Sequence, residues 1–259
     1  MSKIDKKKSS PVKKRQDSGT VNAAEIAQFD RLGQDWWDEN GPMRPLHRLN
    51  PVRMTYIRDR ICDHFDRQPQ AKALAGLRIA DIGCGGGLVT EPLCRLGASV
   101  TGIDAGIENI KIAKAHAAAQ GLDIDYRADS VENIAAKGAK FDVVTALEII
   151  EHVDDVPLFI RSCCEIVAPN GLLIFSTLNR TAKSYALGII AAEYLLRWVP
   201  RGTHDWKKFL KPSEISRHLQ ESDFKVADVT GLVYRPLSRD FALSKTDLDV
   251  NYFLTTTRA

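Results

Sequence analysis

Cysteine is sparse in this sequence and follows no functional pattern. The 259 residues include five cysteines, and no two of them form a C-x-x-C pair or the spacing of a metal site. This excludes a cysteine-based zinc or redox centre and favours reduced thiols in a cytosolic-type compartment. Cys84 lies inside a glycine-rich turn, where the need for a small neutral side chain is a sufficient explanation.

The N-terminus lacks an apolar run, and the surplus of basic charge is confined to it. Residues 1–20 carry seven Lys or Arg against two Asp, a net charge of +5; the remaining 29 Lys or Arg and 31 Asp or Glu give −2. We expect residues 1–21 to form a disordered basic tail without the apolar centre of a secretion signal. The tail is either simply solvated or adds attraction to anionic lipid. Nucleic-acid binding is not expected, because the folded part is not basic.

The stretch from residue 77 to residue 104 holds the most informative pattern. An apolar run, Leu77–Ile82, leads into a turn with four glycines; a helical pattern follows, and a second apolar run ends at Asp104. Strand, turn, helix and strand make the first βαβ unit of a parallel sheet, whose ligands bind beyond the carboxyl ends of the strands. The length fits one large α/β domain over residues 22–259.

The glycine turn suits a ligand that carries adenosine. Gly83 and Gly85 let a ligand approach the backbone and permit a tight turn, and Asp104 can accept hydrogen bonds from both hydroxyls of a ribose. A dinucleotide fingerprint would read G-x-G-x-x-G, but its third glycine position is Leu88. The observed form, D-x-G-x-G-x-G from Asp81, resembles the first motif of class I S-adenosylmethionine-dependent methyltransferases. An NAD-binding oxidoreductase and a non-catalytic nucleotide-binding protein remain the alternatives.

Further segments are similar to one particular family. They read W-W-D-E-N-G-P-M-R-P-L-H-R-L-N-P-V-R at 36–53, E-I-I-E-H-V at 148–153, F-S-T-L-N-R at 175–180, G-T-H-D-W-K-K-F at 202–209 and D-V-N-Y at 249–252. With D-I-G-C-G-G-G, these blocks resemble the ubiquinone-pathway O-methyltransferases, and the similarity extends over residues 22–258. The resemblance implies a class I methyltransferase fold, α/β and Rossmann-like, with a seven-stranded, mostly parallel sheet and helices on both faces. It also implies that S-adenosylmethionine contacts Arg53, Gly83, Asp104 and Leu147, where the guanidinium suits the methionine carboxylate.

The segment before the first strand is predicted to be a helical lid over the mouth of the site. A helical pattern begins at Asn22 and leads to a pair of tryptophans, which serve either the lid or the core. Three prolines within residues 41–51 argue against a continuous helix there. The next helix is expected to have Asn50 as its cap and Pro51 at its first position, and to run to Phe65.

One acidic residue follows the third expected strand, residues 124–127. In class I methyltransferases an acidic residue at this place accepts a hydrogen bond from the adenine amino group, so Asp129 is a candidate for that contact. Capping of the next helix by Asp129 or Ser130 is the equal alternative.

Glu148, Glu151 and His152 follow the fourth expected strand at positions i, i+3 and i+4. If this stretch turns helically, the three side chains share one face, with Cβ atoms about 5–6 Å apart, and can hold a divalent cation. A solvated acidic loop with a nearby histidine is the alternative on spacing alone. The resembling family uses magnesium at this pattern, which would favour the oxyanion of a phenol whose pKa is near ~10. His152 acting alone as general base is the competing hypothesis.

The resemblance implies O-methylation of polyprenylated phenol and quinol rings, 2-polyprenyl-6-hydroxyphenol and 3-demethylubiquinol, with S-adenosylmethionine as donor. The sulfonium is already activated, so the protein has to place the acceptor oxygen in line with the methyl group and exclude water. No Ser or Cys triad is required, and none is evident. Another small phenol is the alternative acceptor, and a ubiquinone biosynthetic complex is a candidate partner.

Residues 179–205 are expected to form an insertion after the fifth strand. Their core, Y-A-L-G-I-I-A-A-E-Y-L-L-R-W-V at 185–199, is apolar, but its fifteen residues are fewer than the roughly 20 that span a bilayer. An amphipathic helix over 184–199 on an anionic membrane surface and a buried lid helix are the alternatives. Because a polyprenyl substrate resides in the membrane, the resemblance favours a membrane contact and substrate gate, in a cytoplasmic protein peripheral on the inner face of the membrane. After the insertion, the sequence predicts a helix, a strand, a loop over residues 231–249 and a last strand.

Overall fold

The computed structural model describes residues 19–22, 25–26, 35–187, 205–238 and 240–259. Most of the expected basic tail and most of the expected insertion therefore lie outside the described residues. The described elements are α2 (Arg44–His64), β1 (Arg78–Ile82), α3 (Thr90–Arg95), β2 (Ser99–Asp104), α4 (Ile107–Ala119), β3 (Asp125–Ala128), α5 (Val131–Ala136), β4 (Phe141–Leu147), η2 (Ile150–His152), α6 (Val156–Glu165), β5 (Val167–Leu178), α7 (Ala182–Ser184), η4 (Trp206–Lys208), α8 (Pro212–Gln220), β6 (Phe224–Arg235), β7 (Asp240–Ser244) and β8 (Asn251–Arg258).

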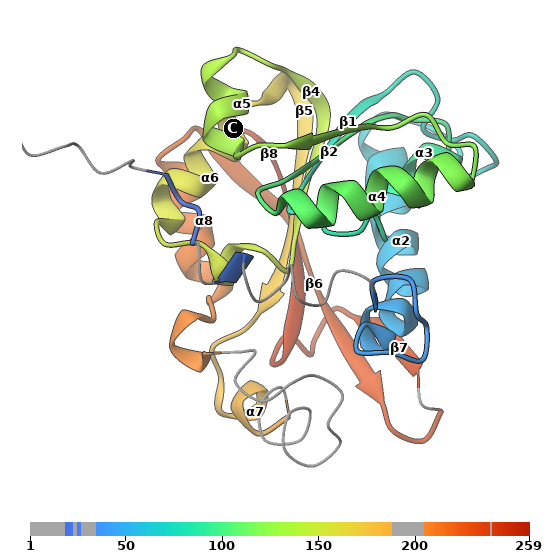
Figure 1. The fold of residues 1–259 in the computed structure, drawn as a ribbon. Coiled ribbons are helices and arrows are strands. Elements are labelled where there is room, and N and C mark those ends of the chain that lie inside the picture. Colours follow the sequence, from blue (N-terminus) through green and yellow to red (C-terminus); the bar gives the residue numbers. More distant parts are fainter. Residues whose placement is uncertain (1–18, 23–24, 27–34, 188–204, 239) are drawn as a thin grey trace, which may run out of the picture.

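A single mixed sheet organises the molecule (Figure 1). Its strand order is β3-β2-β1-β4-β5-β8-β6-β7. The first five strands pair in parallel, and β8 joins β5 and β6 as an antiparallel strand. From β1 the chain first runs outward to β2 and β3. It then returns to the other side of β1 to form β4 and β5, so the strand order reverses beside β1. Such a reversal opens a crevice at the carboxyl ends of the strands.

The sheet has eight strands because a hairpin replaces the loop expected over residues 231–249. The strand β6 continues to Arg235, and β7 returns antiparallel to it, with Leu232 opposite Leu243. The predicted loop was therefore wrong for residues 231–235 and 240–244, which are paired strands. The side chains Leu232, Val233 and Tyr234 suit a strand, and β6 and β8 still form the expected terminal pair.

Helices cover both faces of the sheet, as the sequence predicted (Figure 1). Successive residues of a strand point to opposite faces, so each central strand contributes to two cores. One core packs β1, β4, β5 and β8 against α5, α6 and α8, and the other packs them against α2 and α3. The helix α4 is followed by Gly121 at φ +65°, a left-handed conformation that commonly ends a helix.

The helix α2 begins at Arg44, earlier than the sequence indicated. Pro45 lies in its first turn, where a missing N–H costs nothing, but Pro51 lies inside the helix. The expected cap at Asn50 was wrong, since its side-chain amide donates to the carbonyl of Leu88 at 2.7 Å. That contact and the burial of Leu49 fix the helix against the glycine turn, which offsets the local cost of an internal proline.

The strand β5 begins at Val167, immediately after α6. The segment Pro169–Gly171 therefore lies within the strand, beside an irregularity in its pairing with β4. A register shift between Phe141 and Val143 accommodates the proline, which cannot donate a ladder hydrogen bond.

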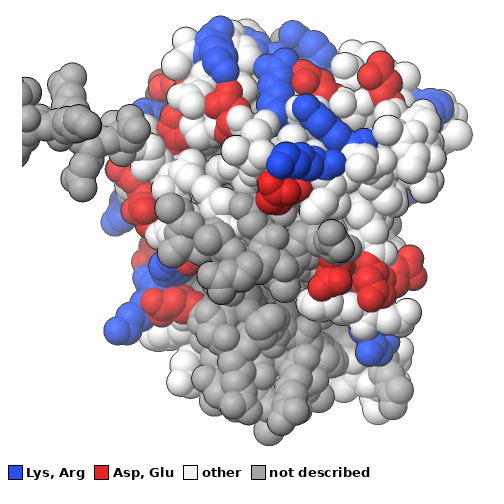
Figure 2. Space-filling view, viewed as in Figure 1, with Lys and Arg blue, Asp and Glu red and all other residues white. Residues whose placement is uncertain are grey.

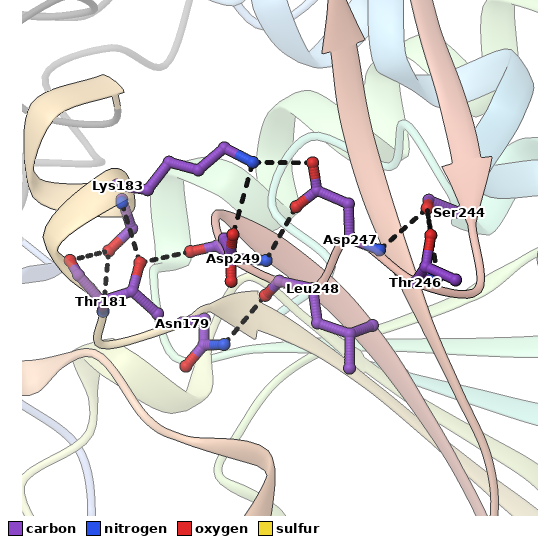
Figure 3. A network of polar contacts seen from close by, with 9 residues as sticks. Asn179, Thr181, Lys183, Ser244, Thr246, Asp247, Leu248 and Asp249 are labelled. Carbon is purple, nitrogen blue, oxygen red and sulfur yellow. Dashed lines mark hydrogen bonds and ion pairs between the residues drawn. The ribbon is translucent and has the colours of Figure 1, made fainter.

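Polar contacts fix the start of the expected insertion to the segment before β8 (Figure 3). The ammonium of Lys183 lies 2.7 Å from Asp247 and 3.4 Å from Asp249. The amide of Asn179 donates to the carbonyl of Leu248 at 2.8 Å, and the hydroxyl of Thr181 donates to the carbonyl of Asp249 at 2.6 Å. No helix in the described part of the chain is long and apolar enough to cross a membrane.

Lys and Arg side chains lie beside Asp and Glu side chains over the described part of the face shown in Figure 2. This interspersion agrees with the small net charge that the sequence gives to the folded part.

Candidate functional site

A cavity of about 260 Å³ lies at the carboxyl ends of β1, β2 and β4. It occupies the place that the reversed strand order predicts for a ligand. All the candidate site residues line it, namely Arg53, Gly83, Gly85, Asp104, Asp129, Leu147, Glu148, Glu151 and His152. The structure thus brings together residues from five separate segments of the sequence.

The glycine turn is covered directly by Trp36. Gly83 and Gly85 have φ values of +73° and +52°, which glycine adopts without strain. A Cβ atom on Gly85 or Gly86 would lie within 2.4 or 2.5 Å of the Trp36 ring. Trp36 is 8% exposed and also packs with other apolar residues, so it serves both the lid and the core.

Asp104 organises the backbone around the cavity. Its carboxylate accepts the backbone N–H groups of Gly85 at 2.9 Å and Gly106 at 2.7 Å, and the amide of Asn109 at 3.2 Å. Asn109 in turn accepts from the indole of Trp36 at 2.9 Å. Asp104 therefore links the glycine turn, the start of α4 and the cover of the cavity, while its contact with a ribose stays a prediction.

The structure shows which of residues 129 and 130 caps the helix α5, but it does not test the contact of Asp129 with adenine. Ser130 is the cap of α5, and its hydroxyl accepts from the backbone of Asn133 at 3.3 Å. Asp129 accepts from the side chains of Asn133 at 2.8 Å and Lys137 at 2.5 Å. Asp129 still lines the cavity, so its contact with adenine stays a prediction.

Arg53 is a buried cation whose hydrogen-bonding capacity is largely unused. It is 4% exposed, and its Nε and Nη2 atoms have no hydrogen-bond partner among the described residues. Burial lowers its pKa, although the charges of Glu148 and Asp81 oppose this effect. The nearest carboxylate oxygen, on Glu148, is 3.9 Å from Nη2. An unsatisfied buried guanidinium in a cavity wall is suited to bind a carboxylate ligand.

Asp81, the first residue of the glycine motif, is fully enclosed below the turn. Its carboxylate accepts from the hydroxyls of Thr90 at 2.7 Å and Thr145 at 2.8 Å. Burial raises its pKa to about 6, although both hydrogen bonds and the charge of Arg53 act to lower it. The residue therefore ties β1 to α3 and β4 at the base of the cavity.

The acidic loop after β4 does not turn as an α-helix. Glu148 adopts a left-handed conformation with φ +52°, and only residues 150–152 form a short 3₁₀ helix. Glu148 accepts from Ser176 at 2.6 Å and from Asn251 at 2.9 Å, and Glu151 accepts from Thr177 at 2.8 Å. The helical turn on which a shared face of Glu148, Glu151 and His152 depended is therefore not formed.

No group of three or more His, Cys, Asp or Glu residues in the described part of the chain is arranged to hold a metal ion. The carboxylates of the loop are nevertheless close enough to interact. Burial and the charge of Glu148 raise the pKa of the Glu151 carboxyl well above its ordinary value. A proton or a cation beside these two groups would relieve their repulsion.

His152 is paired with a carboxylate that sequence reasoning missed. Its Nδ1 atom lies 3.0 Å from Glu25 Oε2, and Lys208 Nζ lies 2.7 Å from Glu25 Oε1. Burial alone would raise the pKa of Glu25, but the bond from Lys208 and the interactions with His152 hold it below its usual value. Glu25 is 127 residues from His152 in the sequence, and no local pattern signals their contact.

The N-terminal segment forms another wall of the cavity. The backbone N–H of Asp154 donates to the carbonyl of Thr20 at 2.9 Å, and the amide of Asn22 donates to the carboxylate of Asp154 at 2.7 Å. Thr20 is 2% exposed, and it lines the cavity together with Asn22, Glu25 and Ile26. The described residues of the segment therefore lie where a lid was expected.

The fold, with its cavity at the carboxyl ends of the strands, is that of the class I methyltransferases. A family model described as a methyltransferase domain matches residues 54–229. A solved magnesium protoporphyrin IX methyltransferase from Synechocystis PCC 6803 is similar with a TM-score of 0.57 and 20% identity, over 93% of this chain and 90% of that one. A possible histamine N-methyltransferase from Thermotoga maritima is similar with a TM-score of 0.61 and 15% identity, over 89% and 98% of the two chains. These structures support the fold.

Relatives of higher identity define the family within that class. A ubiquinone biosynthesis O-methyltransferase from Methylobacterium sp. (strain 4-46) is 50% identical over 92% of this chain and 96% of its own length. One from Bartonella bacilliformis is 52% identical over 91% of this chain and 95% of its own. The chain belongs to the family of ubiquinone biosynthesis O-methyltransferases.

Proposed function

We propose that this protein transfers the methyl group of S-adenosylmethionine to ring hydroxyls of 2-polyprenyl-6-hydroxyphenol and 3-demethylubiquinol. The single observation that carries the proposal is that a buried, unsatisfied Arg53 and the Glu25-paired His152 line one cavity beside the glycine turn. The names of the relatives support the pathway and the kind of reaction.

The donor site follows from the chemistry of the cavity wall. The guanidinium of Arg53 suits the methionine carboxylate, and Gly83 and Gly85 let the ligand approach the backbone. Asp104, Asp129 and Leu147 line the same cavity. We assign Asp104 to the ribose, Asp129 to adenine and Leu147 to a further contact with the donor. Trp36 excludes water by lying over the turn, which helps to hold the reactants in line.

His152 is proposed as the group that accepts the hydroxyl proton. A phenol of pKa near ~10 is mostly protonated at neutral pH, so transfer requires a group that takes its proton, and a neutral imidazole can do so. As the proton leaves, the oxygen bonds to the methyl carbon and the carbon–sulfur bond breaks, with its electron pair remaining on sulfur. The products are the methyl ether and S-adenosylhomocysteine.

The competing proposal is that Glu148, Glu151 and His152 hold a divalent cation, magnesium first, which would stabilise the acceptor oxyanion when bound. His152 would then be a ligand of the cation and would not accept the proton. The repulsion that raises the pKa of Glu151 supports this proposal. In the structure these side chains bond to Ser176, Asn251, Thr177 and Glu25, so binding an ion requires them to exchange partners.

Transfer of labelled methyl to a short-chain demethylubiquinol tests both proposals. If the cation is required, transfer by the protein as purified is lost after chelation and recovers on addition of magnesium. S-adenosylhomocysteine binding, measured by calorimetry, should be the same throughout. Full transfer in chelator would remove the cation and leave His152 as the base, whereas NADH binding without S-adenosylhomocysteine binding would overturn the methyltransferase proposal.

We propose that residues 184–199 contact an anionic membrane surface and that the protein is cytoplasmic and peripheral on the inner face of the membrane. The apolar sequence of this segment and its basic flanks support the proposal. Tyr185 and Leu187, its described apolar residues, are 48% and 49% exposed. Flotation with anionic liposomes should recover the intact chain and much less of a chain without residues 184–199. Equal flotation of both chains would reject the role of the segment.

A further inference from the structure

We propose that Glu25 is a positioning residue for His152 and that Lys208 holds Glu25 in place. The inference rests on the proposed function of His152 at the acceptor hydroxyl, and it adds two residues from distant parts of the chain. One oxygen of Glu25 meets the imidazole and the other meets the ammonium of Lys208, at 3.0 and 2.7 Å.

The contact between Glu25 and His152 determines which ring nitrogen carries the proton. An ionised carboxylate can only accept a hydrogen bond, so Nδ1 of His152 must be the donor. In the neutral ring the lone pair that accepts a proton is then on Nε2. Without Glu25 the ring could exchange its tautomer and rotate, and the fraction of molecules with Nε2 ready to accept would fall.

Glu25 and Lys208 are themselves anchored. The backbone N–H of Glu25 donates to the side chain of Asn22 at 3.1 Å, and Asn22 donates to Asp154, two residues after His152. Lys208 lies in the short helix η4, whose cap, Asp205, accepts from the backbone of Lys207 at 3.0 Å. Glu25 thus lies between His152 and Lys208 of η4, with the geometry of an orienting group.

The degree of exposure favours a positioning role over a contribution to stability. The side chains of His152 and Glu25 are 10% and 20% exposed, but that of Lys208 is 37% exposed. An ion pair with a partner as exposed as Lys208 contributes little to the free energy of unfolding. Loss of the ion pair between Glu25 and Lys208 should therefore reduce turnover much more than it reduces the melting temperature.

The kinetic test compares Glu25→Ala, His152→Ala and the double variant in the methyl-transfer assay. We expect Glu25→Ala to lower kcat by about 10- to 100-fold, as replacing an orienting partner of a histidine commonly does. The KM for S-adenosylmethionine should stay unchanged. In the His152→Ala background, Glu25→Ala should cause almost no further loss, because its effect acts through His152. Lys208→Met should lower kcat by a smaller factor.

A spectroscopic readout separates orientation from a general structural effect. Long-range ¹⁵N–¹H spectra recorded over a pH series distinguish the two neutral tautomers of a histidine from each other and from the protonated ring. The signals of His152 are those absent from the His152→Ala spectrum. We expect the Nδ1–H tautomer in the wild type and a mixture, or the Nε2–H form, in Glu25→Ala.

The pair formed by Glu108 and Lys111 provides a matched control. These side chains are also 2.7 Å apart, but they lie on the exposed face of α4 and do not line the cavity. Glu108→Ala and Lys111→Met should leave kcat and the His152 spectrum unchanged.

The outcomes distinguish the inference from the proposed function. If His152→Ala abolishes turnover while Glu25→Ala keeps full kcat, or if the double variant shows the product of both losses, the inference is wrong and the proposed function stands. If His152→Ala itself keeps full kcat, the proposed role of His152 fails. An unchanged tautomer in Glu25→Ala would also overturn the inference.

Discussion

Replacing Arg53 by methionine is expected to weaken S-adenosylhomocysteine binding by about 10²- to 10⁴-fold. A hydrogen bond to a charged group contributes about 1.5–3 kcal/mol, and a guanidinium can make two such bonds to one carboxylate. Each 1.4 kcal/mol corresponds to about a tenfold change in affinity. Calorimetric titration of the variant measures the loss directly.

The same substitution is expected to raise the melting temperature of the ligand-free protein. The Nε and Nη2 atoms of Arg53 are buried without a hydrogen-bond partner among the described residues. Replacing a buried, poorly compensated charge by an apolar side chain of similar volume is often neutral or stabilising by about 1–4 kcal/mol. The removal of its attraction to Glu148 opposes this gain, so we expect a rise of a few degrees at most.

Arg48→Met on the same helix is the control for the Arg53 experiment. Arg48 is exposed and does not line the cavity. The substitution Arg48→Met should therefore change the affinity for S-adenosylhomocysteine and the melting temperature very little. An Arg53→Met variant that binds S-adenosylhomocysteine like the wild type would show that the donor carboxylate does not bind there.

Replacing His152 by alanine is expected to lower kcat by about 10²- to 10⁴-fold while the affinity for S-adenosylhomocysteine is retained. Proton transfer by a positioned side chain typically contributes a factor of this size. The donor contacts proposed for Arg53, Asp104 and the glycine turn do not involve the imidazole. Single-turnover methyl transfer and calorimetry measure the two quantities separately.

His64→Ala is the matched control for His152→Ala. His64 is exposed at the end of α2, and its ring contacts the carbonyl of Asn170 away from the cavity. The His64→Ala variant should therefore retain full turnover. A loss of both turnover and donor affinity in His152→Ala would contradict a role confined to the acceptor.

Local sequence patterns and the family resemblance point to the residues proposed for the donor. The glycine turn, Asp104 and Arg53 follow from strand and turn patterns within short stretches or from motif resemblance, and all of them line the cavity. Parallel strands end at one edge of a sheet, so residues after successive strands meet there. The capping of α5 by Ser130 was likewise among the local alternatives.

The remaining features depend on contacts between distant segments. Glu25 and Lys208 are 183 residues apart, and only the folded chain brings them to His152. The left-handed conformation of Glu148 redirects the acidic loop, which helical spacing could not anticipate. The internal proline of α2 and the additional strand β7 show tertiary packing and pairing overriding turn signals.

A crystal structure with S-adenosylhomocysteine tests the central claim most directly. We predict that the ligand fills the cavity with its carboxylate on Arg53, its ribose beside Asp104 and its sulfur toward the side of the cavity that His152 lines. A structure with the ligand bound elsewhere, or with a dinucleotide pyrophosphate against Gly83 and Gly85, would contradict the account.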